Sequence, residues 1–109
     1  MSVDKTSYEW LFFKRRLSWL RRGPFCMGLY RGFVNQENEA RPGFTDRLRH
    51  LALAILKTED DMLYVRQAIC ALAVVGTEED IPVIQGLDVQ GNMELVVDVK
   101  TCIYEIKHR

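Results

Sequence analysis

The stretch from 61 to 75 would be apolar on almost every side of a helix, and this feature constrains the fold more than any other. A core-facing stripe with the i, i+3, i+4, i+7, i+8 spacing is formed by Val65, Ala68, Ile69, Leu72 and Ala73. The opposite side is also apolar and carries Leu63, Cys70, Ala71 and Val74. A helix that is apolar all round is stable only where neighbouring elements enclose it. We therefore expect this helix to be enclosed by other helices.

Helical periodicity continues along the rest of the chain without sustained period-two alternation, and it predicts an all-α fold. The chain is divided by Gly23-Pro24, a polar loop at 35–43, an acidic turn at 58–61, Gly76-Thr77 and a turn at 88–92. About six helices are predicted, at 4–22, 25–34, 44–57, 61–75, 78–87 and 92–107. Gly28 and Gly32 weaken the second of them, by about 1 kcal/mol each relative to Ala.

The last predicted helix, 92–107, is expected to be buried on one side only. Its core stripe is formed by Leu95, Val96, Val99, Cys102, Ile103 and Ile106. The residues predicted to face away from the core are Asp98, Thr101, Glu105 and His108. A polar outer face of this kind is typical of a terminal helix that caps a stack.

Two of these helices repeat each other. The segment "VRQAICAL" (65–72) aligns without gaps to "VKTCIYEI" (99–106), at a spacing of 34 residues. In both, an aliphatic residue is followed by a cation and then by small and aliphatic residues at the same helical offsets. A period in the thirties indicates stacked helical pairs.

The segment "VRQAICALAVVGTEEDIPVI" resembles the HEAT-like (armadillo-type) helical repeats. The matching residues are Val65, Arg66, Ala68, Gly76, Glu79, Ile81 and Pro82. Leu72 departs from the common pattern because it lies one residue early. The resemblance covers about 44–107 and implies a short right-handed α-α superhelix made of the pairs 44–57/61–75 and 78–87/92–107. Residues 1–34 would then be an N-terminal helical addition within one domain, 1–109. Since HEAT-like folds serve as adaptors, inhibitors, lyases and glycosylases, the resemblance implies no activity.

The chain is neutral overall but its charge is unevenly distributed. Of its 109 residues, 1–50 hold ten Lys/Arg and five Asp/Glu, whereas 51–109 hold five and ten. Such a chain can be held together by its own charges or can offer each half to a different partner. The three cysteines have no metal-binding spacing, and no signal peptide or membrane-length apolar run is found. We expect a cytoplasmic protein with reduced thiols.

No catalytic, cofactor or metal motif is found in the sequence, and we expect none of these functions. His50 and His108 have no Cys, Ser or second His at useful spacing. The acidic clusters "TEDD" and "TEED" lie immediately before helices, where carboxylates are expected as caps. Thr77 and Asp80 have the spacing of a capping box, with Asp in place of the usual Glu.

The N-terminal segment "EWLFFKRRLSWLRRGPF" has five cations and eight apolar residues in 17 positions. On a helix its apolar side chains form two opposed arcs. One arc is Trp10, Phe13, Leu17 and Leu20, and the other is Tyr8, Phe12 and Trp19. The cations lie between the arcs: Lys14, Arg15, Arg16, Arg21 and Arg22. An interfacial membrane helix would have a single wide apolar face, so no membrane role is expected.

Three interpretations of this segment stay open. Both arcs are buried within the domain, or the Tyr8/Phe12/Trp19 arc binds a protein partner or a second copy of the chain, or the five cations bind nucleic acid. We favour a non-enzymatic protein-binding module, in its most concrete form an inhibitor or immunity-type protein that neutralises a basic toxin or nuclease. Acidic residues would complete its binding surface: Glu59, Asp60, Asp61, Glu78, Glu79 and Asp80. The alternative is a nucleic-acid-binding accessory protein.

Overall fold

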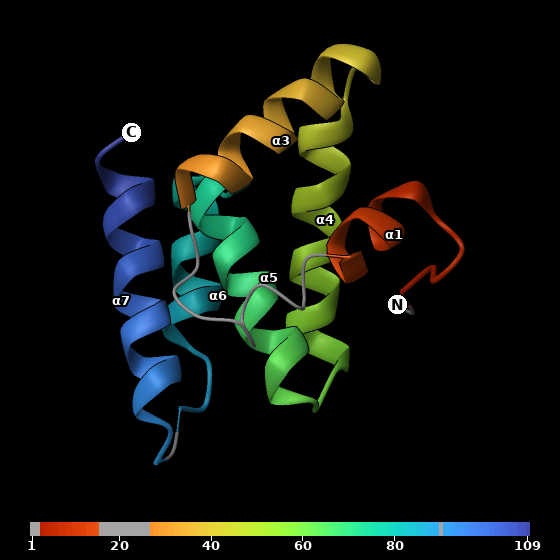
Figure 1. Cartoon of the computed structure of the whole chain (residues 1–109). Helices are drawn as coiled ribbons and strands as arrows, with labels where there is room; N and C mark the ends of the chain where they lie inside the picture. The colour runs from red at the N-terminus through yellow and green to blue at the C-terminus, as the bar shows by residue number, and fades with distance from the viewer. Residues whose placement is uncertain (1–2, 16–26, 90) are drawn as a thin grey trace.

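The structure, a computed structural model, describes residues 3–15, 27–89 and 91–109, and the regular structure in these residues is entirely helical (Figure 1). It contains six α-helices: α1 (Tyr8–Arg15), α3 (Met27–Ala40), α4 (Phe44–Thr58), α5 (Met62–Val75), α6 (Ile81–Gln85) and α7 (Met93–Lys107). One 3₁₀ turn, η1 (Glu78–Asp80), leads into α6. The prediction of an all-α chain is confirmed. Within these residues, no helix combines the length and the apolar character needed to cross a bilayer.

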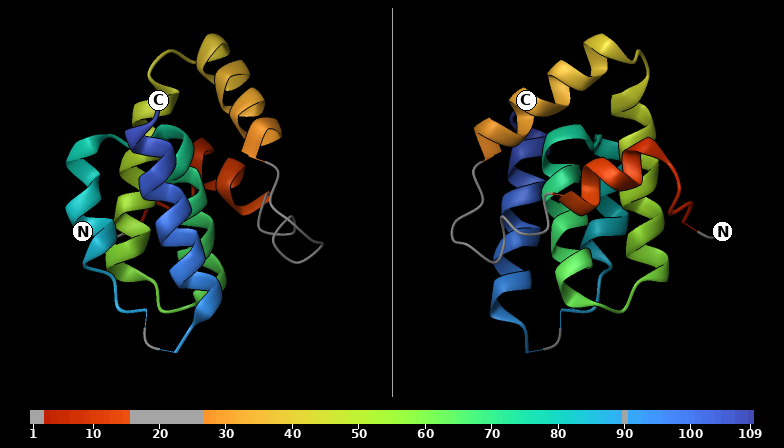
Figure 2. Two further views of the ribbon diagram at one scale, coloured as in Figure 1. Left: turned by 90° about the vertical axis from the view of Figure 1, so that its left-hand side faces the viewer. Right: turned by 45° about the vertical axis from the view of Figure 1, so that its right-hand side comes forward.

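Helices α4, α5 and α7 form the central layer of the molecule. Residues 59–61 join α4 and α5 into an antiparallel hairpin, and α5 packs against α4 on one side and α7 on the other. Helices α5 and α7 start at the same end of the molecule (Figure 1). Helices α1 and α6 lie on opposite sides of this layer, as the left-hand view of Figure 2 shows. Helix α3 crosses one end of the layer and packs on α4 and α5.

Helix α5 is the most deeply enclosed element, as its apolar sequence predicts. Every residue from 67 to 75 is buried. Its start is capped by Asp61, whose carboxylate accepts a hydrogen bond from the backbone N–H of Leu63 at 2.9 Å. Its last turn is closed by Gly76, whose N–H bonds the carbonyl of Leu72 at 2.7 Å. Enclosure removes nearly all of this apolar surface from water and is the main source of stability for such a helix.

The predicted loop at 35–43 is wrong, because α3 continues through most of it to Ala40. Residues 35–40 include Gln, Glu and Ala, which are good helix formers. An ion pair between residues four apart supports the extension, with Arg41 Nη1 3.4 Å from Glu37 Oε2. The chain turns only at 41–43, where Gly43 has a φ of 88°. A polar segment can therefore extend a helix that another part of the same helix anchors in the core.

Two other helix boundaries differ from the prediction. The helix expected from residue 4 begins at Tyr8, because the side chain of Asp4 accepts a hydrogen bond from the backbone of Thr6 at 2.9 Å and stabilises a turn there. Its expected continuation from 16 to 22 lies outside the described residues. The helix expected at 78–87 consists of η1 followed by the short α6, with Pro82 in the first turn of α6, where no N–H is needed.

Candidate protein-binding face

The predicted partner-binding residue Phe12 is not at the surface. Its side chain is 3% exposed. The ring packs edge-on against Phe44 and Tyr30, at centroid distances of 5.0 and 5.7 Å. The expectation that Phe12 belongs to an exposed aromatic stripe is therefore wrong, because α3 and the start of α4 cover this side of α1.

Tyr8 is half-buried and fixes α1 to the turn between α3 and α4. Its ring meets Phe44 edge-on at 6.0 Å, and the guanidinium of Arg41 lies 3.8 Å from the ring centroid. A hydrogen bond to the carboxylate of Glu37, together with burial, raises the pKa of the Tyr8 hydroxyl. The third predicted aromatic residue, Trp19, lies outside the described residues.

The opposed arc of α1 is also packed within the domain. Trp10 and Phe13 are buried, and both rings lie against Tyr64 of α5, at 5.7 and 6.3 Å. Helix α1 therefore lies between α5 on one side and α3 and α4 on the other. Among the described residues, the interpretation in which both arcs are buried is the one that fits. Leu17 and Leu20 lie outside them.

The two predicted acidic clusters do not form one surface. They lie at opposite ends of α5, which has 14 residues and is therefore about 21 Å long. In the first cluster, Glu59 lies 3.6 Å from Lys5, Asp61 caps α5 and Asp60 is exposed. In the second cluster, the side chains of Glu78 and Glu79 are exposed.

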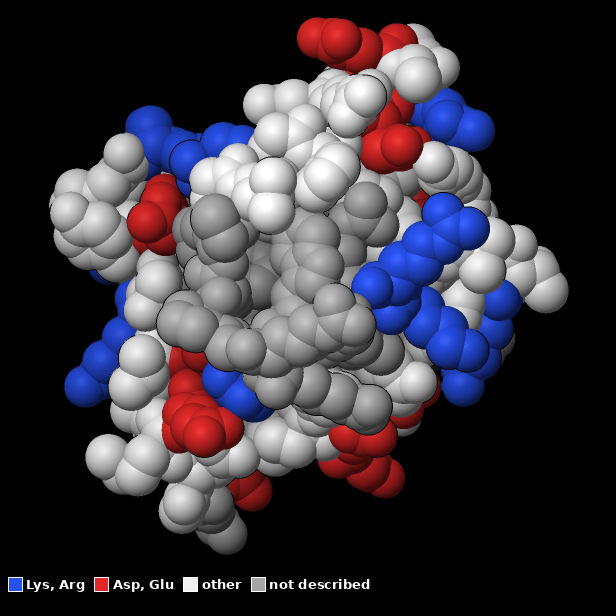
Figure 3. Space-filling model, viewed as in Figure 1, with Lys and Arg blue, Asp and Glu red and all other residues white. Residues whose placement is uncertain are grey.

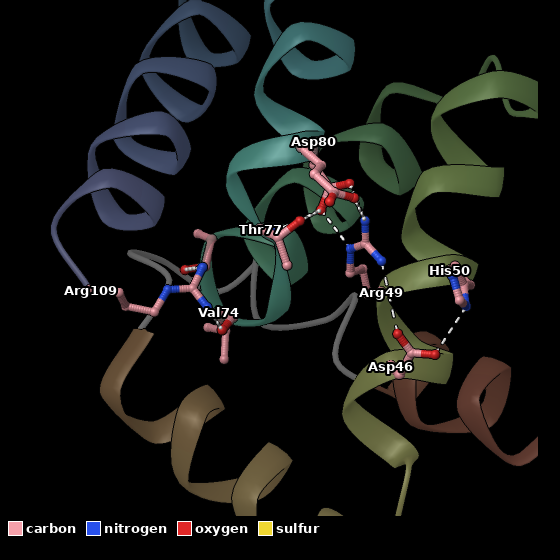
Figure 4. Close-up of polar contacts among 9 residues, drawn as sticks. Asp46, Arg49, His50, Val74, Thr77, Asp80 and Arg109 are labelled. Atoms are coloured by element: carbon pink, nitrogen blue, oxygen red, sulfur yellow. Dashed lines mark hydrogen bonds and ion pairs between the residues drawn. The ribbon is translucent and has the colours of Figure 1, made fainter.

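Asp80, the last of the predicted acidic residues, is buried instead of exposed (Figure 4). Its carboxylate accepts hydrogen bonds from Arg49 Nε at 2.7 Å and Nη2 at 2.8 Å, and from the backbone N–H of Thr77 at 2.8 Å. The expected capping box is confirmed. Burial opposes ionisation of this group, but the hydrogen bonds from Arg49 and Thr77 outweigh it, and the pKa of Asp80 is lowered. Asp80 is therefore an internal structural residue and cannot contact a partner.

The cations proposed for the nucleic-acid alternative are only partly described. Lys14 and Arg15 are exposed at the end of α1. Lys and Arg side chains gather over α1 and the adjoining part of α4, at the right of Figure 3. Arg16, Arg21 and Arg22 lie outside the described residues.

A face that the sequence did not predict as a binding surface lies on α7. We define the α7 outer face as Met93, Val97, Lys100, Tyr104 and Lys107, all of which are exposed. Its three large apolar side chains are 75%, 58% and 59% exposed at Met93, Val97 and Tyr104. In the described part of the chain, no other helix has more than one exposed large apolar residue. Helix α7 is nearest the viewer in the left-hand view of Figure 2, with no described helix in front of it.

The spacing of the α7 outer face is typical of helix packing. Its members follow one another at intervals of 4, 3, 4 and 3 residues, which keeps them on one side of α7. The opposite side of the helix is buried through Leu95, Cys102 and Ile106. Helix α7 therefore has one apolar side in the core and a second, partly apolar side at the surface.

The acidic residues beside this face are already paired with cations of the domain. Arg66 of α5 lies 2.7 Å from Asp98 and 2.9 Å from Glu94, and Arg31 of α3 lies 3.6 Å from Glu105. Asp98 is thus directed toward α5, so the expectation that it faces away from the core is wrong. Among the described residues, Lys100 and Lys107 form no ion pair.

The signal for the α7 outer face was present in the sequence. The core stripe of this helix uses the apolar positions from Leu95 to Ile106, and Met93, Val97 and Tyr104 do not belong to it. Apolar residues left over after one complete stripe indicate a second contact surface. The prediction of a polar outer face considered only the polar residues on that side.

Other features of the described surface fit a binding site less well. A hollow of about 550 Å³ lies over the exposed side of α4, lined by His50, Leu53, Ala54, Lys57 and Thr58. All of these residues come from one helix, whereas ligand sites usually bring together polar groups from several elements. Within the described residues, no group of three or more His, Cys, Asp or Glu side chains is arranged to hold a metal ion.

Comparison of the chain with protein-family models, with curated proteins and with solved structures found no match.

Proposed function

We propose that the protein acts as a protein-binding module, without chemistry of its own, and that the α7 outer face is its contact surface. The exposure of Met93, Val97 and Tyr104 in one row carries this proposal. Isolated exposed apolar residues are ordinary, but a contiguous row is typical of an interaction site. Tyr and Met are also enriched at protein interfaces.

The arrangement of the helices supports the proposal that this is a HEAT-like stack. Helices α4 and α5 form one pair, and α6 and α7 form the next. Two ion pairs join them in equivalent ways, Arg49–Asp80 across 31 residues and Arg66–Asp98 across 32. In a stack of helical pairs, each pair buries its outer side against the next one. In such a stack, the α7 outer face would occupy the position where a further pair packs.

An inhibitor is the most concrete form of the proposed function. A domain of this size can cover the active surface of an enzyme or toxin without contributing any reacting group. The exposed carboxylates of Asp60, Glu78 and Glu79 would raise the rate of encounter with a basic partner, since charges outside the buried contact act mainly on association. This role predicts that a purified partner loses activity when one equivalent of the protein is added.

The test is affinity purification with negative charges placed on the α7 outer face. Val97→Asp with Tyr104→Asp should abolish recovery of any partner that the wild type retains. Circular dichroism should show that this variant is folded, because both side chains are exposed. Leu11→Asp, at an isolated exposed apolar residue of α1, is the control and should retain the partner. Equal recovery of the same partner by the wild type and the Val97/Tyr104 variant would contradict the proposal.

A further inference from the structure

We infer that the occupant of the α7 outer face is an amphipathic helix of another protein with carboxylates directed at Lys100 and Lys107. This inference rests on the proposed function and names the chemistry of the partner. It is carried by the spacing of the face, by the charges within and beside it, and by the poor fit of a second copy.

The spacing points to a helix as the partner element. Alternating intervals of 4 and 3 residues average 3.5 residues, which is the periodicity with which two helices pack side by side. From Met93 to Lys107 the face covers 14 residue steps, about 21 Å along the helix axis. A strand has a side-chain period of two, which does not match the spacing of these residues along α7.

The charges on α7 point to carboxylates on the helix that docks there. Lys100 lies in the middle of the row, between Val97 and Tyr104, and Lys107 lies at its end. Glu94 and Asp98 at the border both bind Arg66, at 2.9 and 2.7 Å, so each of these carboxylates already has a cationic partner within the domain. A lysine can lay its methylene stem along an apolar contact while its ammonium reaches the rim. A helix that covers this face must therefore supply its own carboxylates at the rim.

A second copy of the chain fits this face poorly. An antiparallel pair in which Met93 of each copy meets Tyr104 of the other places its two-fold axis between Val97 and Lys100. Both copies of Lys100 would then lie close to the axis, where like charges repel. Glu94 and Asp98 already bind Arg66, which makes them weaker partners for these ammonium groups than unpaired carboxylates would be.

The test uses synthetic helical peptides of about 20 residues, a length that allows stable helix formation. All share one row of leucines at intervals of 4 and 3, and they differ only at rim positions, which hold Glu, Gln or Lys. Amide NMR spectra of the isotopically labelled protein give the affinity and the site. We expect all shifts to centre on Val97, Lys100 and Tyr104, and the Glu peptide to bind roughly threefold more tightly than the Gln peptide.

Charge reversal makes the test specific. Lys100→Glu should reverse the order, so that the Lys peptide binds most tightly. Lys57→Glu, at an exposed lysine of α4, should leave the order unchanged. If the three peptides bound with equal affinity and Val97→Asp abolished their binding, the preference for carboxylates would be overturned and the proposed function would stand. Shifts that avoid α7 with every peptide would contradict both.

Self-association is measured on the same samples. Sedimentation velocity should show a monomer for the wild type. A dimer that Val97→Asp dissociates would identify a second copy as the occupant and would overturn the inference.

Discussion

Arg49 of α4 and Asp80 of η1 form a bidentate ion pair, with Nε–Oδ2 and Nη2–Oδ1 distances of 2.7 and 2.8 Å. The same carboxylate accepts a hydrogen bond from the N–H of Thr77, so one side chain both caps a helical turn and links the two helical pairs. Figure 4 shows this junction between α4 and the turn that follows α5.

Removal of the Asp80 carboxylate is expected to destabilise the protein strongly. Asp80→Ala leaves the Arg49 guanidinium and the Thr77 N–H without their shared partner, at a cost of about 3 kcal/mol in the free energy of unfolding. Urea titration followed by circular dichroism measures this. Glu79→Ala is the control, because the Glu79 side chain is 90% exposed and should change stability by less than about 0.5 kcal/mol. Similar losses in the two variants would contradict the structural role of Asp80.

The same carboxylate is expected to make stability depend on pH under acidic conditions. The pKa of Asp80 is lowered in the folded state from its usual value of 3.8. The unfolded chain therefore binds the proton more readily, and this stabilisation is fully present above the usual value and is lost as the pH falls through the folded pKa. Thermal unfolding at a series of pH values should show the advantage of the wild type over Asp80→Asn shrinking in this window. A constant difference would contradict the assignment.

Two glycines should respond in opposite ways to the same substitution. A Cβ at Gly76 would lie 2.5 Å from the carbonyl oxygen of Leu72 and 3.1 Å from Ile106 Cδ1, so Gly76→Ala should cost about 1 to 3 kcal/mol of stability. A Cβ at Gly32 meets nothing within 4 Å, so Gly32→Ala in α3 should gain about 0.5 to 1 kcal/mol. Denaturant unfolding of the two variants tests this. Unchanged or increased stability in Gly76→Ala would be inconsistent with the packing around Gly76, and a loss in Gly32→Ala would be inconsistent with the open space at Gly32.

Gln67 is expected to reduce the stability of the core. Its side chain is fully buried, and neither atom of its amide has a hydrogen-bond partner in the described part of the structure. Gln67→Met keeps the length of the side chain and removes both unpaired groups, so stability should rise by about 1 kcal/mol. Gln67→Ala controls for lost volume and should destabilise. A decrease with Met comparable to that with Ala would mean that the amide is satisfied in solution.

Cys70 and Cys102 are expected to be unreactive in the folded protein. Burial raises the pKa of each thiol to about 12, so the nucleophilic thiolate is scarce at neutral pH. In a Cys26→Ser variant, which leaves only these two thiols, iodoacetamide should label neither until denaturant unfolds the chain. Mass spectrometry measures the labelling. Rapid modification without denaturant would contradict the burial of α5 and α7 against each other.

Much of the helical framework was predictable because it depends on neighbours within one turn. The enclosure of α5 follows from its apolar periodicity, and the cap at Thr77 and Asp80 follows from their spacing of three residues. The extension of α3 to Ala40 does not follow from composition, because polar residues occur in helices as well as in loops. Polarity describes the exposed face of a helix and does not by itself end it.

The candidate site was less predictable than the fold. Two opposed aromatic arcs on α1 suggested a free surface, but α1 is covered on both sides in the described structure, and Phe12 is buried as deeply as Trp10. Helical periodicity shows how many faces of a helix are apolar. It cannot show which of those faces another segment will cover.

By itself, the sequence determined that the chain is helical, that 61–75 is enclosed and that the acidic turns serve partly as caps, because each of these properties follows from a pattern of residues close together in the sequence. Only the tertiary structure decided that Asp80 binds Arg49, that Asp98 binds Arg66, and that Met93, Val97 and Tyr104 stay at the surface. Those outcomes depend on how each helix is rotated when it packs against helices more than 30 residues away. That rotation is set by the whole core and by no local pattern.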